Sequence, residues 1–303
     1  MNNIKNNTTM ELHYILDYAM RDKENASYGY EIDGRKYDRY MSNEGWNSYL
    51  EEEMSDVHRE QYEKGDGGEM NEKKGRWGIY PPKMACYGSS SRIIYTCLRE
   101  VGGIKFEHQL PTRVGSRPAN LDAYLNADIR DIFIEAKCRE IYAKHSKVRA
   151  SIGYNDVYKH ISEYHNSFSF GADIISDNQG VKDKNNYNYR FFYNNKPVIR
   201  FDIKQLISHF LGIAAGVLEG VIKDNIRFVY FIYNPKELGN EDLKRVYAET
   251  INEIGKNDEI DKIGIIELFK TVFEYQKKNL KIEKVMPKFE FVLADQNNIM
   301  NYL

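Results

Sequence analysis

Residues 119–138 read ANLDAYLNADIRDIFIEAKC, and this stretch decides the fold that the chain is expected to adopt. Residues 120–126 alternate between apolar and polar side chains, and residues 132–134 are an apolar run that continues into Glu135, Ala136 and Lys137. Both patterns predict β-strands. Strands this close in sequence pair antiparallel, so residues 127–130 are expected to form a four-residue hairpin loop. The apolar second strand ends in two opposite charges, Glu135 and Lys137, which indicates a site.

The hairpin predicts that two carboxylates lie side by side. Side chains alternate between the faces of a strand, so Glu135 and Lys137 share one face. A loop at residues 127–130 places Asp122 directly across from Glu135, with roughly 5 Å between their Cβ atoms. Two carboxylates at this distance repel unless they share a proton or a cation. We therefore predict a Mg²⁺ site formed by Asp122, Glu135 and the backbone carbonyl of Ala136.

Lys137 adds a cation beside this predicted metal site. An amine there can orient or help to deprotonate a water molecule and can stabilise charge on a phosphate. Because Mg²⁺ keeps several water ligands and binds phosphate oxygens, the predicted chemistry is phosphodiester hydrolysis. Other acid-x-lysine spacings lie in a polar run at residues 72–74 or at helix starts, where an acid caps N–H groups. The alternative for residues 135–137 is a solvent-facing hairpin with an incidental ion pair.

The segments around the hairpin predict a mixed α/β order. A helix at about 92–100, with serine caps at residues 89–91, precedes a strand at 104–110 and the hairpin. The remaining expected elements are a helix at about 151–168, a Tyr- and Asn-rich loop at 176–196, a helix at 202–222, a strand at 227–233, helices at 10–21, 241–256 and 262–279, and a strand at 289–293. The later strands need crossovers, so the sheet is expected to be mixed.

This order, with Asp122, Glu135 and Lys137 in place, resembles the PD-(D/E)xK, or restriction-endonuclease-like, nuclease superfamily. The three residues stand at the two acidic positions and the lysine of the motif, although Leu121 replaces the usual proline. The resemblance implies a restriction-endonuclease-like α/β/α sandwich with a central mixed β-sheet over residues 81–303. Mainly helical additions are expected at both ends: an accessory segment at 1–80, irregular because it is polar, acidic and interrupted by glycines, and a helical extension from about 236.

The resemblance implies a Mg²⁺-dependent endodeoxyribonuclease of restriction or genome-defence type, in which Mn²⁺ can replace Mg²⁺. The expected substrate is double-stranded DNA, and a homodimer stays open because many duplex cutters bring two centres to two strands. A DNA repair or recombination nuclease is the alternative within the same chemistry. Two further alternatives are a catalytically silent nucleic-acid-binding module of the same fold and a metal-dependent hydrolase of small phosphates.

Assisting residues are expected around the centre. Glu107, on the strand before the hairpin, is preferred over Glu100 as a further acid. Gln205 and His209 share one helix face, so Gln205 is expected to orient Lys137 or a phosphate and His209 to bond a neighbouring group. The alternative for both is a polar seam inside the core. Predicted DNA contacts are drawn from the basic residues near the centre in sequence, although a plain surface charge is the favoured interpretation for each one taken singly: Arg92, Arg113, Arg117, Lys144, Lys147 and Arg149.

Composition limits the other possibilities. The 303 residues are 42% hydrophobic, which allows a sizeable core, and 43 basic against 45 acidic residues leave a formal charge of −2. A DNA-binding surface must therefore be a local patch. Three cysteines without C-x-x-C spacing indicate neither disulfides nor zinc and favour a cytoplasmic location. No secretion signal is recognised, and the apolar run at 206–222 is too short and too polar for a membrane span.

Overall fold

The structure is a computed structural model, and it describes most of the chain. The described residues are 28–65, 69–75, 78–115, 117–138, 148–176, 182–198, 201–234 and 262–303. The helices expected at 10–21 and 241–256 lie outside them.

A five-stranded mixed sheet forms the centre of the molecule, in the order β13-β12-β7-β6-β5. β5, β6 and β7 pair antiparallel, whereas β12 runs parallel to both β7 and β13. The bounds are Ile104–Leu110 (β5), Ala119–Ala127 (β6), Arg130–Lys137 (β7), Asn225–Ile232 (β12) and Lys288–Ala294 (β13). The predicted strands and the mixed sheet are thus confirmed.

The register of the β6/β7 hairpin follows from its apolar pattern. Ala123 pairs with Ile134, and the last pair before the turn joins Ala127 to Arg130. The turn therefore contains only residues 128 and 129, so the four-residue loop was wrong in length. The pairing is nevertheless the one expected, because the shorter turn simply adds one more pair to the same ladder.

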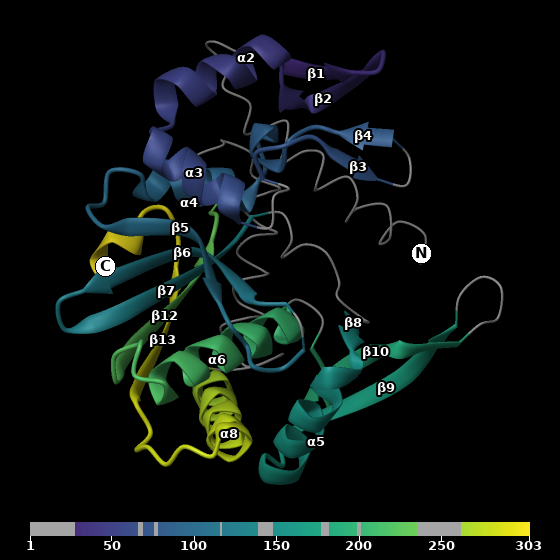
Figure 1. Ribbon diagram of the computed structural model, residues 1–303, viewed down its shortest axis with the longest axis vertical. Coiled ribbons are helices and arrows are strands. Elements are labelled where there is room, and N and C mark those ends of the chain that lie inside the picture. The colour runs from purple at the N-terminus through teal and green to yellow at the C-terminus, as the bar shows by residue number, and fades with distance from the viewer. Residues whose placement is uncertain are drawn as a thin grey trace.

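Helices cover both faces of the sheet. Figure 1 shows α3 (Asp56–Lys64) and α4 (Ser90–Leu98) on one side, and α6 (Ile203–Leu218) with α8 (Lys262–Leu280) on the other. The sequence sets their starts: the side chains of Ser89 and Asp202 accept hydrogen bonds from the first turns of α4 and α6. These helices confirm the ones expected at 92–100, 202–222 and 262–279.

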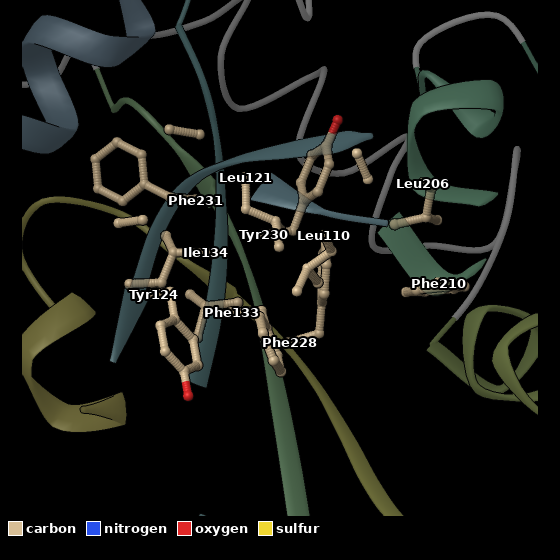
Figure 2. Close-up of a cluster of buried hydrophobic side chains, with 14 of the residues drawn as sticks. Leu110, Leu121, Tyr124, Phe133, Ile134, Leu206, Phe210, Phe228, Tyr230 and Phe231 are labelled. Atoms are coloured by element: carbon tan, nitrogen blue, oxygen red, sulfur yellow. The ribbon is translucent and has the colours of Figure 1, made fainter. Parts of the chain in front are cut away.

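Aromatic and aliphatic side chains fill the space between α6 and the sheet. Figure 2 shows Leu206 and Phe210 reaching from α6 toward Leu110 and Phe228, and the ring centroids of Phe210 and Phe228 lie 5.4 Å apart. On the hairpin, the ring of Phe133 stacks on that of Tyr124 at 5.1 Å. This packing is what fixes the rotation of α6 about its own axis, and hence the direction of its polar side chains.

A second sheet corrects the interpretation of residues 151–196. The expected long helix is α5, Asn155–Tyr164, and it is preceded by the strand β8, Val148–Ser151. The expected loop at 176–196 is instead mostly the strand β10, Lys182–Tyr193, paired with β9, Phe168–Ser176. Aromatic residues recur in β10 at positions 187, 189, 191 and 193, which is a strand period, and Phe192 is the one aromatic residue between them. A composition rich in Tyr and Asn concealed that period.

The additions at the two ends also differ from expectation. Residues 28–80 contain regular elements rather than an irregular segment: the hairpin strands β1 (Tyr28–Ile32) and β2 (Arg35–Met41), the helix α2 (Asn43–Ser48), α3, and the short strands β3 (Lys73–Gly75) and β4 (Gly78–Tyr80). Their buried residues, such as Tyr62, belong to the same hydrophobic cluster as the central sheet. At the other end, β13 joins that sheet as a parallel strand, so this part is not a purely helical extension. Among the described residues, no helix has the length and apolar content needed to cross a membrane.

Candidate active site

The open end of the β6/β7 hairpin brings Asp122 next to β7. The ladder ends at Ala123 and Ile134, so Asp122 and Glu135 are the next residues opposite each other. Here the Asp122 carboxylate takes the place of a backbone acceptor: its Oδ2 accepts the N–H of Ala136 at 2.7 Å. The side chain of Asp122 is thus held against β7 while keeping partial exposure.

Glu135 and Lys137 meet on one face of β7, as period-two alternation requires. Lys137 Nζ lies 2.5 Å from Glu135 Oε1 and 2.6 Å from Gln205 Oε1. The Glu135 side chain is only 2% exposed and that of Lys137 12% exposed, so this ion pair lies largely inside the protein. Gln205 therefore makes the contact with Lys137 that its position on α6 predicted.

His209 approaches the other oxygen of Glu135. Its Nε2 lies 2.9 Å from Glu135 Oε2, and both side chains are buried. The ring N–H is not aligned for a full hydrogen bond, so we regard this as a close electrostatic contact. Glu135 thus has Lys137 at one oxygen and His209 at the other, which fixes the orientation of the carboxylate.

The carbonyl of Ala136 points toward the same place as Asp122. The N–H and C=O of one strand residue point to the same side of that strand. The N–H of Ala136 points to Asp122, whereas the carbonyl of Lys137 faces β12 and accepts the N–H of Tyr233 at 2.9 Å. The Ala136 carbonyl therefore faces β6, beside the Asp122 carboxylate.

Glu107 adds a third acid in the same row of the sheet. It lies on β5 opposite Asp122 of β6, and this pair is skipped in an otherwise continuous ladder. Glu107 has a φ of 49°, which is unusual for a residue inside a strand. A Cβ added at Gly65 would lie 3.0 Å from its Oε2, so its side chain packs at the end of α3. Glu100, the competing candidate, is instead 93% exposed beside Arg99.

The electrostatics of the two central carboxylates differ. Burial and the neighbouring Glu135 raise the pKa of Asp122 well above its ordinary value, against the opposing effect of Lys137. Burial would raise the pKa of Glu135 too, but Lys137 and His209 outweigh it and lower that pKa to about 2. Asp122 is thus the carboxylate whose ionised form lacks sufficient compensation from the protein.

The donor chemistry fits a hard divalent cation. Asp122, Glu135 and the Ala136 carbonyl offer oxygen atoms, which Mg²⁺ prefers, and Mg²⁺ completes its shell with water. The position of Asp122 opposite Glu135 and beside Ala136, together with its raised pKa, favours a cation. In the described part of the chain, no cluster of three or more His, Cys, Asp or Glu side chains is arranged to hold a metal. A site with two carboxylates and a backbone carbonyl does not require such a cluster.

A cavity opens beside this centre. It has a volume of about 230 Å³ and lies between the start of β6 and the first turns of α6. Gln205 and His209, which contact Lys137 and Glu135, also line it. Sequence reasoning missed this cavity, because its shape depends on how α6 packs against the sheet.

Two of the predicted DNA contacts are engaged within the protein. The guanidinium of Arg92 lies 5.2 Å from the ring centroid of Tyr49 and 4.6 Å from that of Tyr87. Arg113 forms two hydrogen bonds with the carboxylate of Glu219, at 2.8 and 2.9 Å. Both arginines thus have structural contacts that their charge alone did not suggest.

The other predicted contacts are only partly described. Arg117 is exposed and directly precedes Pro118, which lines the cavity. Lys144 and Lys147 lie outside the described residues, as does the side chain of Arg149. Lys204, at the rim of the cavity on α6, is a cation that the sequence-based prediction did not include.

Comparison with known proteins gives no independent assignment. No protein family, no curated protein and no solved structure matches this chain. The site therefore has to be interpreted from its own geometry.

Proposed function

We propose that this protein is a Mg²⁺-dependent nuclease that hydrolyses phosphodiester bonds in DNA. The observation that carries the proposal is the convergence of Asp122, Glu135 and Lys137 at the open end of one hairpin, with Gln205 on Lys137. The resemblance to the PD-(D/E)xK motif supports the choice of DNA and of a restriction or genome-defence role. A repair or recombination nuclease uses the same chemistry.

Each residue has a defined task in this proposal. Asp122, Glu135 and the Ala136 carbonyl would hold the ion, which when bound supplies Lewis-acid activation of water and of a phosphate oxygen. Lys137 donates to the attacking water or to a phosphate oxygen and stabilises the developing negative charge. Gln205 holds the Lys137 side chain in place, and His209 holds Glu135. Glu107 acts through its negative charge on Asp122.

Plasmid nicking tests the proposal. With Mg²⁺, the wild-type protein is expected to convert supercoiled plasmid to nicked or linear forms, and chelation should stop it. Lys137→Ala should lower the rate about 100- to 1,000-fold, the usual cost of removing one donor that stabilises charge in the transition state. Lys288→Ala removes an equal charge from an exposed position on β13 and should cut like the wild type.

Other outcomes separate the alternatives. Equal cutting by the Lys137→Ala variant would overturn the proposal and place the activity elsewhere. DNA binding without any strand scission would favour a silent binding module. Release of phosphate from nucleotides, with intact plasmid, would favour a hydrolase of small phosphates.

A further inference from the structure

The cavity beside the candidate centre has a mixed set of polar groups. Asn120 contributes an Oδ1 atom that is buried and has no hydrogen-bond partner within the described part of the chain. A buried acceptor without a partner costs roughly 1–3 kcal/mol, so such a group calls for an explanation. A ligand that donates a hydrogen bond to Asn120 would supply one.

Donors line the α6 side of the same cavity. Gln205 uses its Oε1 for Lys137, which leaves its amide nitrogen to donate. Ser208 accepts from the Tyr154 hydroxyl at 3.0 Å and keeps its own proton to donate. Lys204 adds a positively charged donor to the lining. The cavity therefore presents both an acceptor and several donors.

This combination disfavours a phosphate as the occupant. A DNA phosphodiester carries no proton at neutral pH and only accepts hydrogen bonds, so the Asn120 oxygen and the nearby Asp202 carboxylate would oppose it. The helix start is also already capped, because Asp202 Oδ1 accepts the N–H of Gln205 at 2.9 Å. A flat, uncharged group with donors and acceptors along one edge fits better, and a nucleobase has such an edge.

We propose that this cavity binds one nucleobase of the DNA substrate, next to the phosphate that is cut. The inference rests on the proposed nuclease function and names the part of the substrate that the site would recognise. Asn120 is the specificity-determining residue, since its amide offers a donor and an acceptor to a base edge. A volume of about 230 Å³ suits a single base rather than a whole nucleotide pair.

The experiment is cleavage of a duplex pool with randomised sequence in the presence of Mg²⁺, followed by sequencing of the cut ends. The wild type should prefer one base at one position near the cut by about 5- to 150-fold, which corresponds to the 1–3 kcal/mol of a good base contact. Asn120→Ala and the cavity-filling Asn120→Leu should flatten the preference at that position only. Asn301→Ala, at an exposed asparagine near the C-terminus, should keep it.

The ratio of cutting rates between bases at the preferred position separates base recognition from a structural role of Asn120. If an Asn120 variant merely displaced Asp122, which lies two residues further along β6, it would slow the cutting of all sequences equally. The melting temperature of Asn120→Ala should not fall, since the variant removes an unpartnered acceptor. Cutting by the wild type without any preference near the cut, or a preference that survives both Asn120 variants, would overturn the inference. No cutting at all would instead contradict the proposed function.

Discussion

The two ends of the β6/β7 hairpin both contain acidic side chains that are buried or partly buried, but the surroundings of these acids differ. At the turn end, Asp131 is fully buried and accepts hydrogen bonds from the Tyr124 hydroxyl at 2.9 Å and from the Lys223 N–H at 2.7 Å. At the open end, Asp122 and Glu135 face each other, and the pKa of Asp122 is raised by burial and by that neighbour. Asp131 thus has hydrogen-bond donors for both oxygens, whereas the ionised form of Asp122 is destabilised by burial and by the charge of Glu135.

This difference shows why burial alone does not reveal a function. The oxygens of Asp131 have dedicated donors, and the Lys223 ammonium bonds Asn126 and Ala127 at the same turn. At the open end, Lys137 and His209 lower the pKa of Glu135, whereas the pKa of Asp122 stays raised, and a cavity lies beside this group. The Mg²⁺ ion that we propose would supply positive charge at the open end, whereas the oxygens of Asp131 already have donors within the protein.

The largest expected effect is that of Asp122→Asn, at the open end of the hairpin, on plasmid cutting. Plasmid cutting should fall at least about 1000-fold, because charge stabilisation by a metal is worth several kcal/mol and each ~1.4 kcal/mol is tenfold. The raised pKa of Asp122 means that its ionised form is costly in the folded protein at neutral pH. Urea unfolding at pH 7 should therefore show that this inactive variant is more stable than the wild type without Mg²⁺. A lower free energy of unfolding for Asp122→Asn than for the wild type would contradict the claim that the Asp122 carboxylate is destabilised in the folded protein.

Added Mg²⁺ should raise the free energy of unfolding, and this rise should depend on Asp122 at the open end of the hairpin but not on Asp131 at the turn end. Binding to the folded state raises the free energy of unfolding by about 2.7 kcal/mol when the ion is at 100 times its dissociation constant. Wild type should show this rise in urea unfolding, and Asp122→Asn should lose it. Asp131→Asn, a matched change at the turn end, should keep it. A rise retained by Asp122→Asn would place the ion elsewhere.

Asp131→Asn should have the opposite profile to Asp122→Asn. An amide cannot accept from both Tyr124 and Lys223 through two oxygens, so the free energy of unfolding should fall by about 1–3 kcal/mol. Cutting, measured at a temperature where the variant stays folded, should remain near the wild-type rate. A strong loss of cutting with intact folding would mean that the turn end takes part in catalysis.

The smallest expected effect concerns His108, whose ring stacks on Tyr124 with centroids 4.3 Å apart. Burial, with help from Lys105, lowers its pKa to about 4. The unfolded chain then binds more protons than the folded one between about pH 6.5 and 4, so stability falls as the pH drops through this window. The loss should be about 2 kcal/mol by pH 5 relative to His108→Phe. Parallel unfolding curves for both proteins across this window would refute the shift.

The sequence predicted the hairpin well because alternation and burial specify the same register. Asp122 and Glu135 come opposite each other at either turn length, since both lengths keep the pairing in phase. The prediction of a loop at residues 176–196 was wrong because the Tyr- and Asn-rich composition was given more weight than the two-residue period of β10. The prediction of an irregular segment was wrong for residues 28–80, because short polar hairpins and short helices such as α2 show little periodicity in their sequence.

Part of the site could not be predicted from sequence, because it depends on packing. The spacing of Gln205 and His209 showed that they share a face of α6, but not that this face meets Glu135. That contact requires α6 to lie close to β5, where a Cβ on Gly212 would come within 2.6 Å of Leu110 Cβ. The cavity at Asn120 arises from the same packing.

The most direct test of the central claim is a crystal structure of the protein grown or soaked with Mn²⁺, with anomalous diffraction data. We expect an anomalous peak between the carboxylates of Asp122 and Glu135, within bonding distance of both and of the Ala136 carbonyl. No peak at that position at a Mn²⁺ concentration that supports cutting, or a peak only at other residues, would contradict a shared cation as the basis of this site.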